Sequence, residues 1–227
     1  MIIGSGLIAS ELSGVHLPKG WVVYARGVSD SKSCISEEFE RDRRSLVNSI
    51  SPDLKVIYIS SQACGDPSES SSYIVHKREL EKTVLETSRD NVVLRLPQVC
   101  GPGGNPNNLV NFMSAAASEG GVLLVDPGAR RNLVRGSDLR GLVSSISQIE
   151  VSGLVGFCAP YTYSAGEVAL AILSMVGDKD ATFTEVTESR KSDFSFFCSE
   201  IFSAQSDQIR NFGRQNYLYS ALQESLR

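Results

Sequence analysis

The stretch Gly4-Ser5-Gly6-Leu7-Ile8-Ala9 decides how this chain begins to fold. It matches the pattern G-x-G-x-x-[G/A], follows the apolar pair Ile2-Ile3, and leads into a helix expected at residues 7–14. In such a turn the first glycine permits the tight bend, the second lets the backbone approach a pyrophosphate, and the small third residue lets the helix pack closely on the strand. The helix N-terminus supplies N–H donors for the same anion. Taken alone, the pattern also fits an ordinary glycine turn between a strand and a helix.

Beyond this turn, segments typical of strands alternate with segments typical of helices. Runs rich in β-branched and aromatic residues predict strands at 21–25, 55–60 and 92–96. Shorter strands are expected at 122–125, 153–158 and 182–187, and helices at 36–50, 72–87, 107–118, 138–147, 164–176 and in the polar last part of the chain. This order predicts an α/β fold with a mostly parallel sheet, which binds ligands at the carboxyl ends of its strands.

The composition excludes several classes of protein. Apolar residues make up 41% and charged residues 21% of the 227 residues, as in ordinary globular domains. With 22 basic and 26 acidic residues the net charge is −4, so we expect no nucleic-acid partner. No apolar run approaches the roughly 20 residues of a membrane span, so we expect no membrane association, and the first residues lack the basic segment of a secretory signal.

The five cysteines are spread along the chain without a C-x-x-C pair, at positions 34, 64, 100, 158 and 198. An odd and scattered set fits neither a disulfide framework nor a familiar zinc spacing. We therefore expect free thiols, no metal site and a reducing, cytoplasmic location.

A second pattern with chemical meaning is Tyr73-Ile74-Val75-His76-Lys77, a Y-x-x-x-K sequence on an expected helix. Positions i and i+4 share one helix face, so the Lys77 ammonium is expected beside the Tyr73 phenol, where it would lower the pKa of that phenol. A tyrosine tuned in this way suits general acid/base work. Ser60-Ser61 end the preceding strand, where a hydroxyl can reach a substrate oxygen that the tyrosine also reaches. Each of these patterns is common by itself.

In this chain order, the glycine turn, the serine-ended strand and the Y-x-x-x-K helix together resemble the short-chain dehydrogenase/reductase superfamily. The closest resemblance is to its extended branch of nucleotide-sugar epimerases, dehydratases and reductases. Gly6-Leu7-Ile8-Ala9-Ser10 is similar to the G-F-I-G-S of that branch, and residues 95–103 are similar to its R-x-x-N-V-Y-G-P-G. Residues 131–139 resemble its R-D-x-I-x-V-x-D-[LV], and the resemblance covers residues 1–175.

The resemblance implies a Rossmann-type, doubly wound and mostly parallel sheet, shortened, with a small C-terminal substrate lobe. The expected division is a dinucleotide-binding domain at residues 1–150 and a substrate lobe mainly at 151–227, interleaved with the first. The implied activity is hydride transfer on a nucleotide-linked sugar with NAD or NADP as cofactor. The choice of cofactor and the outcome, net reduction, epimerisation or dehydration, stay open, and a homodimer is expected by analogy. The alternative is a non-catalytic dinucleotide-binding or regulatory protein on the same fold.

Residue by residue, the resemblance implies that Tyr73 is the catalytic acid/base and that Lys77 binds the nicotinamide ribose and tunes Tyr73. Ser61, with Ser60 as the alternative, would hydrogen-bond the substrate oxygen. The implied cofactor-binding residues are Gly4, Ser5, Gly6, Leu7, Ile8, Arg26, Gly27, Ser60, Tyr73, Lys77 and Pro97.

Other charged and polar residues have less specific interpretations. Gln98, which stands where the extended branch has an Asn, and Arg131 would contact the substrate's diphosphate, for which a guanidinium fork is suited. His16 and His76 are expected to be structural, with His76 pointing away from the tyrosine face. The charged run at residues 37–44 is expected to form a solvated helix face.

The chain is short for this resemblance. The interval between Gly6 and Ser61 lacks one or two β–α units of the extended branch. The strand at 21–25 is therefore either the second strand of the sheet, with Arg26 placed for the 2′-phosphate of NADP, or the fourth, with residues 25–29 forming the turn beside the nicotinamide. We favour the fourth strand, because a helix and the serine strand follow it in the order of the family.

Overall fold

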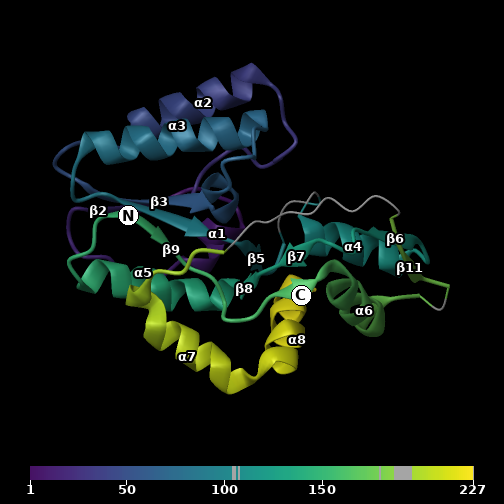
Figure 1. Cartoon of the computed structure of the whole chain (residues 1–227). Helices are drawn as coiled ribbons and strands as arrows, with labels where there is room; N and C mark the ends of the chain where they lie inside the picture. The colour runs from purple at the N-terminus through teal and green to yellow at the C-terminus, as the bar shows by residue number, and fades with distance from the viewer. Residues whose placement is uncertain (104–105, 107, 179, 187–195, 227) are drawn as a thin grey trace. The chain divides into compact units, whose positions relative to one another are not determined.

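The computed structural model of the chain describes residues 1–103, 106, 108–178, 180–186 and 196–226 (Figure 1). The described residues form two compact units. Unit 1 consists of Met1–Pro97, Ser137–Phe157 and the described part of Phe194–Gln205, and unit 2 consists of the described parts of Gln98–Gly136, Cys158–Asp193 and Ser206–Arg227. The boundary expected near residue 150 does not coincide with this division, because the described part of residues 98–136 belongs to unit 2.

Unit 1 is built on a five-stranded sheet (Figure 1). In chain order its strands are β1 (Ile2–Ile3), β2 (Trp21–Tyr24), β3 (Lys55–Ser61), β4 (Val92–Leu96) and β9 (Gly153–Gly156). The strands lie in the order β1-β2-β3-β4-β9 and every pairing is parallel, so the predicted parallel sheet is confirmed. In such a sheet the carboxyl ends of all strands lie together at one end.

The place of β2 decides between the two interpretations of the strand at 21–25. In the doubly wound order 3-2-1-4-5-6 the fourth strand lies next to the first. Because β2 lies between β1 and β3, it takes the place of the fourth strand, and β1 is the outermost strand of the described sheet. Arg26 therefore follows the strand that corresponds to the fourth strand of the doubly wound order. A basic residue that meets the 2′-phosphate of NADP would follow the second strand instead.

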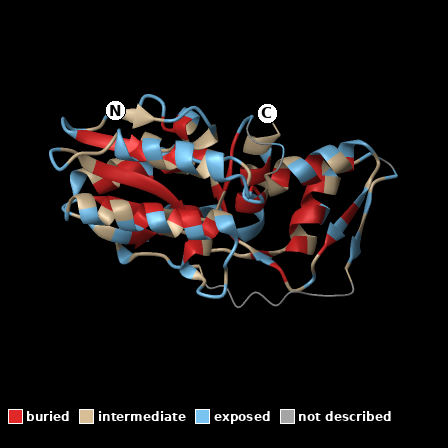
Figure 2. Ribbon diagram, turned by 90° about the horizontal axis from the view of Figure 1, so that it is seen from above, coloured by how far each residue is buried: buried red, intermediate tan, exposed pale blue. Residues whose placement is uncertain are grey.

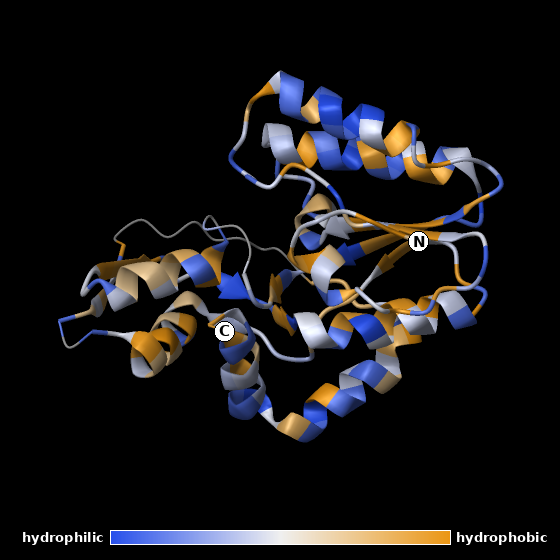
Figure 3. Ribbon diagram, turned by 180° about the vertical axis from the view of Figure 1, so that it is seen from behind, coloured by the Kyte–Doolittle hydropathy of each residue, from blue (hydrophilic) through white to orange (hydrophobic). Residues whose placement is uncertain are grey.

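Helices cover both faces of this sheet, as a doubly wound fold requires. On one face lie α2 (Ser36–Val47) and α3 (Ser72–Thr87), and on the other lie α1 (Leu7–Glu11) and α5 (Leu139–Gln148) (Figures 1 and 3). Helix α1 ends before the expected Gly14, because the N–H of Ser13 donates to the carbonyl of Ser10 and closes a tighter turn.

One part of the core of unit 1 lies between the sheet and the pair α2–α3. Residues 22–24, 56–60 and 92–94 are buried without alternation, the pattern of parallel strands covered on both faces (Figure 2). The cluster beneath α2 and α3 consists of Tyr24, Leu46, Val56, Tyr58, Leu80, Val84 and Val93. The buried face of α3 also carries Lys77 and Glu81, so two charged side chains share an apolar helix face.

Asn91 ties α3 to the sheet. Its side chain is fully buried, its Nδ2 donates to the carbonyl of Val84 at 2.8 Å, and its Oδ1 accepts from the N–H of Val56 at 2.9 Å. One amide therefore satisfies a backbone group of the helix and a backbone group of β3. This link fixes the helix that carries Tyr73 and Lys77 against the strand that carries the two serines.

In its described residues, unit 2 pairs short strands two by two. β5 (Gln98–Cys100) pairs with β8 (Leu133–Arg135), β6 (Val122–Val125) with β11 (Thr182–Glu185), and β7 (Arg130–Arg131) with β10 (Tyr163–Ser164). Its helices include α4 (Leu109–Ser118), α6 (Ala165–Val176) and α8 (Arg214–Ser225), whereas α7 (Ser203–Phe212) begins in unit 1 and ends in unit 2. Residues 107 and 187, which were expected to belong to a helix and a strand, lie outside the described residues.

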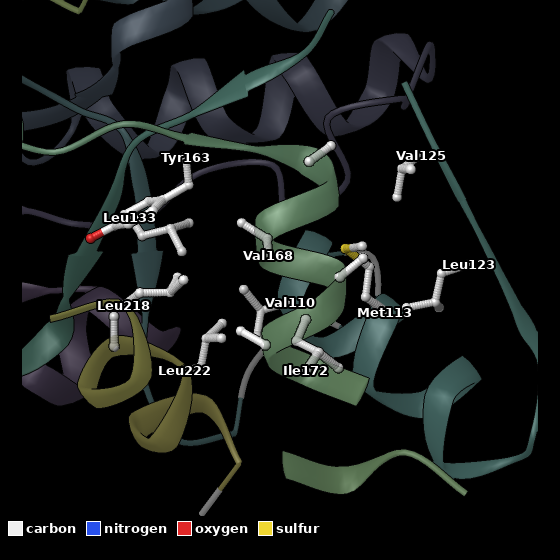
Figure 4. Packing of buried hydrophobic residues seen from close by; sticks show 14 of the residues in the cluster. Val110, Met113, Leu123, Val125, Leu133, Tyr163, Val168, Ile172, Leu218 and Leu222 are labelled. Carbon is white, nitrogen blue, oxygen red and sulfur yellow. The ribbon is translucent and has the colours of Figure 1, made fainter. Parts of the chain in front are cut away.

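The core of unit 2 is assembled from the inner faces of α4, α6 and α8 (Figure 4). Each helix contributes residues three or four positions apart, which lie on one face. The residues labelled in the figure are Val110, Met113, Leu123, Val125, Leu133, Tyr163, Val168, Ile172, Leu218 and Leu222. Helix α6 begins with a capping box, because the Ser164 side chain accepts from the N–H of Glu167 and the Glu167 carboxylate accepts from the N–H of Ser164.

Across the part of the chain that the structure describes, none of the helices combines the length and the apolar character needed to cross a membrane. All five cysteines are free thiols.

We expect Asn91→Ala to destabilise unit 1 by roughly 2 kcal/mol or more, because each buried polar group left without a partner costs about 1–3 kcal/mol. Trp21, the single tryptophan, lies in β2, so its fluorescence during urea unfolding reports on unit 1. Asp90→Ala, at the exposed neighbouring position, is the control and should change the unfolding free energy by less than about 0.5 kcal/mol. Equal stability of the two variants would contradict the bridging role of Asn91.

Candidate active site

The residues singled out from the sequence gather at the carboxyl end of the unit 1 sheet. Gly4 follows β1, residues 25–27 follow β2, Ser60 and Ser61 end β3, and Pro97 follows β4. These strands are neighbours in one parallel sheet, so their ends are neighbours too. Helix α3 adds Tyr73 and Lys77. Two predicted substrate residues, Gln98 and Arg131, belong to unit 2 and are described separately below.

The glycine turn after β1 shows two different constraints. Gly4 has φ +142°, and a Cβ on it would stand 2.6 Å from the carbonyl oxygen of Ala25, so the close approach of the turn to the end of β2 requires glycine. At Gly6 a Cβ would meet no atom within 4 Å. Protein packing therefore explains the first glycine, whereas the second borders open space. Ala9 is buried, as the pattern predicts for its small third residue.

Lys77 is the charged centre of the site. It is only 5% exposed, its Nζ donates to the Tyr58 hydroxyl at 3.1 Å, and it donates to the carbonyl of Ile59 at 3.4 Å. A Cβ on Gly27 would stand 3.1 Å from this Nζ, so the chain after β2 passes directly beside the ammonium. An ammonium has three N–H donors. Among the described residues the third has no acceptor.

Tyr73 lies one turn before Lys77 on α3, and the Lys77 Nζ stands 6.0 Å from the centre of its ring. Within the described parts of the chain its hydroxyl has no hydrogen-bond partner. Burial is the main cause that raises the pKa of Tyr73 to about 12, and the electrostatic influence of Cys64 and Asp42 adds to it. The expected lowering of this pKa by Lys77 is therefore wrong for the chain by itself. The reason is geometric: the ammonium is held against Tyr58 and Ile59 instead of the Tyr73 oxygen.

Ser60 and Ser61 point to opposite faces of β3, because successive strand residues alternate. The buried Ser60 Oγ donates to Glu81 Oε1 at 2.6 Å, which commits it to a structural contact with α3. The Ser61 Oγ accepts from the N–H of Ala63 at 3.2 Å, so its own hydrogen stays available to donate. The geometry therefore favours Ser61 over Ser60 as a group that can bind a ligand.

Glu81 and Arg95 form a buried ion pair between α3 and β4. Arg95 donates from Nε to Glu81 Oε1 at 2.9 Å and from Nη2 to Oε2 at 2.6 Å. The side chains are 8% and 15% exposed for Glu81 and Arg95, and the bidentate geometry uses both carboxylate oxygens. Together with the contact between Ser60 and Glu81, this ion pair fixes α3 to both β3 and β4.

Arg78 fixes the loop between Ser61 and Tyr73. This loop begins with the 3₁₀ helix η1 (Gln62–Gly65). The Arg78 guanidinium donates to the carbonyls of Cys64 at 3.1 Å and Glu69 at 2.8 Å, and also to that of Asp66. Because one side chain binds three loop carbonyls, it ties the loop to the helix that carries Tyr73. Nothing in the local sequence pattern indicates this role.

Asp42 is a buried carboxylate in the helix that was expected to be solvated. It is 3% exposed, its Oδ1 accepts from the Tyr24 hydroxyl at 3.2 Å, and its Oδ2 lies 3.0 Å from His76 Nε2. The expectation of a solvated face at residues 37–44 is therefore wrong at this position. The spacing gave a signal: Asp42 lies between Phe39 and Leu46 at positions i, i+3 and i+7, on the inner face of α2.

The two predicted substrate residues lie near each other within unit 2. Gln98 is the ladder partner of Leu133, two positions after Arg131 in the chain. Arg131 is half-buried, its Nη1 donates to the carbonyl of Arg130 at 3.1 Å, and burial lowers the pKa of its guanidinium. Of the other predicted cofactor residues, Ser5 and Arg26 are exposed, and Leu7 and Ile8 are half-buried.

No family model matches the chain, and no curated protein matches its sequence. The fold, in contrast, is similar to that of many solved structures. A dTDP-4-dehydrorhamnose reductase from Bacillus anthracis in complex with NADP has 17% identity and a TM-score of 0.67, over 90% of this chain and 80% of that chain. An NAD-dependent NDP-hexosamine 5,6-dehydratase involved in tunicamycin biosynthesis has 16% identity and a TM-score of 0.66, over 96% and 80%.

A UDP-N-acetylglucosamine 4-epimerase from Methanobrevibacter ruminantium in complex with UDP-N-acetylmuramic acid has 15% identity and a TM-score of 0.64, over 100% of this chain and 81% of that chain. At these identities the likeness shows a shared fold. The expected Rossmann-type fold is thereby confirmed, and the chain is shorter than these neighbours.

We expect Glu81→Gln to destabilise unit 1 by about 3–5 kcal/mol, because Arg95 then keeps a buried charge without its counter-ion. Urea unfolding followed by Trp21 fluorescence measures the change. Glu86→Gln on the exposed face of the same helix removes the same charge, and it should be nearly neutral. The structural role of the pair is excluded if the two variants unfold at the same urea concentration.

Proposed function

We propose that this chain is an NAD(P)-dependent enzyme that transfers a hydride at a carbinol or keto carbon of a nucleotide-linked sugar, with Tyr73 as the acid/base. The observation that carries the proposal is the buried Lys77 ammonium, which keeps one donor unused. Its Nζ stands 6.0 Å from the ring centre of Tyr73, whose hydroxyl has no hydrogen-bond partner among the described residues. Both groups belong to the carboxyl end of a doubly wound sheet, the end at which such sheets bind ligands. The fold shared with nucleotide-sugar enzymes supports this choice of substrate class.

The residues at this end fit a nicotinamide dinucleotide in three respects. The third Lys77 donor suits a ribose hydroxyl, and the open space beside Gly6 admits a pyrophosphate. The lack of a side chain at Gly27 leaves room beside the ammonium. We assign the pyrophosphate to Gly4, Ser5, Gly6, Leu7 and Ile8, and the nicotinamide half to Gly27, Tyr73, Lys77 and Pro97. The dinucleotide supplies the hydride chemistry when it is bound.

The protein groups move and hold the proton. Ser61 donates its free hydrogen to the reacting substrate oxygen, and Tyr73 exchanges a proton with that oxygen. Because the pKa of Tyr73 is about 12 in the chain by itself, its hydroxyl is protonated at neutral pH and is ready to act as an acid. To act as a base and take a proton from the substrate, Tyr73 needs a lower pKa, which a Lys77 ammonium closer to its hydroxyl would supply.

The substrate's diphosphate is assigned to Gln98 and Arg131 of unit 2. A guanidinium binds phosphate oxygens through a planar fork, and the amide of Gln98 adds a donor. Reductases, epimerases and dehydratases share a hydride transfer at a sugar carbon. We propose this shared step and assign no further one.

A non-catalytic dinucleotide-binding or regulatory protein is the second candidate, and two observations favour it. The described sheet ends at β1, so the strands that normally lie beyond it, toward the adenosine half of a dinucleotide, are absent from the described residues. The raised pKa of Tyr73 is also unfavourable for a general base.

The proposal predicts that Tyr73→Phe lowers turnover at least ~100-fold, the usual contribution of a general acid or base, while dinucleotide affinity changes less than about twofold. Fluorescence titration with NADH and NADPH measures binding, and assays with UDP- and dTDP-sugars measure turnover. Val75→Ala, an exposed position on the same helix, is the control and should match the unmodified chain in both measurements.

Retained turnover in Tyr73→Phe would remove Tyr73 from the mechanism. Binding of a dinucleotide without turnover of any of these sugars would favour the regulatory candidate. Failure to bind either dinucleotide would contradict both candidates.

A further inference from the structure

A buried polar cluster lies close to Lys77, where β2 meets the helices α2 and α3. It consists of Tyr24 from β2, Asp42 from α2 and His76 from α3, and we call it the Asp42 cluster. Asp42 and His76 are each 3% exposed and Tyr24 is fully buried. The proposed reaction uses none of these three residues, although His76 directly precedes Lys77 in the chain. A carboxylate placed this deeply needs an explanation, because burying a charge is costly unless it is paired.

The contacts of Asp42 are those of an ionised carboxylate. Oδ1 accepts from the Tyr24 hydroxyl at 3.2 Å, and the Asp42 backbone carbonyl lies 3.4 Å from the same hydroxyl. Oδ2 lies 3.0 Å from His76 Nε2. An ionised carboxylate can only accept hydrogen bonds, so this arrangement places the imidazole hydrogen on Nε2.

The other imidazole nitrogen limits the charge of His76. His76 Nδ1 is buried and has no hydrogen-bond partner among the described residues. A second hydrogen on Nδ1 would be a buried donor without an acceptor, which costs free energy. The geometry therefore makes His76 a neutral donor to Asp42, and the negative charge of Asp42 is not cancelled by its neighbour.

That negative charge lies close to Lys77. The Asp42 Oδ2 and the Lys77 Nζ both lie within 4 Å of the point where a Cβ on Gly27 would stand. Burial lowers the pKa of Lys77, and the charge of Asp42 is the largest influence that opposes this lowering.

The other titratable or charged groups that interact with Lys77, or with its neighbours on the adjacent elements, are Tyr24, Arg26, Tyr58, Cys64, Tyr73, His76, Glu81 and Arg95. The carboxylate of Glu81 is occupied by both ends of the Arg95 fork. Burial raises the pKa of the Cys64 thiol, which keeps it neutral at neutral pH. Asp42 is thus the acidic group near Lys77 whose charge has no basic partner of its own.

We infer that Asp42 is a positioning residue that holds Lys77 as a charged ammonium at the ligand-binding end of the sheet, and that His76 and Tyr24 orient it. Asp42 itself touches neither substrate nor cofactor in this assignment. The electrostatic part of the inference concerns the free chain. Its consequence for dinucleotide binding rests on the proposed function.

The first test uses the unmodified chain. It contains only two histidines, so nitrogen NMR of the imidazole rings, with His16→Gln for assignment, resolves His76. Hydrogen on Nε2 alone at pH 7 is the expected result. Hydrogen on Nδ1 alone would require a protonated Asp42, and hydrogen on both nitrogens would cancel its charge. Either of these results overturns the inference without any variant at position 42.

The second test measures the titration of the Lys77 amine by NMR in chains labelled at lysine. Asp42→Asn keeps the shape of the side chain and removes its charge, so the Lys77 midpoint should fall by about one pH unit or more. Glu40→Gln, an exposed position on the same helix, removes the same charge and should leave the midpoint in place. Equal midpoints in the two variants overturn the inference.

The consequence for ligand binding is measured separately, by NADH titration across pH. A neutral Lys77 amine loses its attraction for a bound dinucleotide, so the loss of affinity at high pH should begin about one unit lower in Asp42→Asn than in Glu40→Gln. If NADH affinity begins to fall at the same high pH in the two variants, the positioning role of Asp42 is contradicted. If the unmodified chain binds no NADH at all, the proposed function fails, while the two NMR results still decide the electrostatic inference.

Discussion

The fold of unit 1 depends on one constraint, the burial of the Lys77 ammonium. A charge taken out of water must find acceptors and a counter-charge, or the fold cannot keep it. The hydroxyl of Tyr58 and the carbonyl of Ile59 supply the acceptors from β3, and Asp42 supplies negative charge from α2. Gly27 leaves room for the ammonium beside the end of β2. Three neighbouring elements are therefore arranged around one side chain of α3.

A second buried charge on the same helix, that of Glu81, has a direct counter-ion. Glu81, one turn after Lys77, is neutralised by Arg95 through two hydrogen bonds and also binds Ser60. Both carboxylate oxygens of Glu81 accept hydrogen bonds from the protein, and the pair serves to hold α3 against β3 and β4. Lys77 keeps an unused donor, whereas both oxygens of Glu81 already accept hydrogen bonds from the protein, and this difference separates a site residue from a structural residue on one helix face.

Much of this arrangement can be predicted from the sequence. The buried strands, the parallel sheet, the glycine turn at Gly4 and the shared face of Tyr73 and Lys77 all follow from local spacing. The place of β2 was one of two open interpretations, because strand order depends on which elements pair in space. The role of Asp42 was missed, since a charged run such as residues 37–44 is solvated in most proteins. The pKa of Tyr73 was predicted in the wrong direction, because spacing along a helix does not reveal what the lysine binds instead.

The most direct test of this account is NADH titration of Lys77→Met, with Lys82→Met on the exposed face of the same helix as the control. A hydrogen bond from a charged group contributes about 1.5–3 kcal/mol, so Lys77→Met should weaken NADH binding roughly 10- to 100-fold. Lys82→Met should bind NADH like the unmodified chain. Equal affinities of the two variants would contradict the central claim that the buried ammonium of Lys77 is held for a ligand.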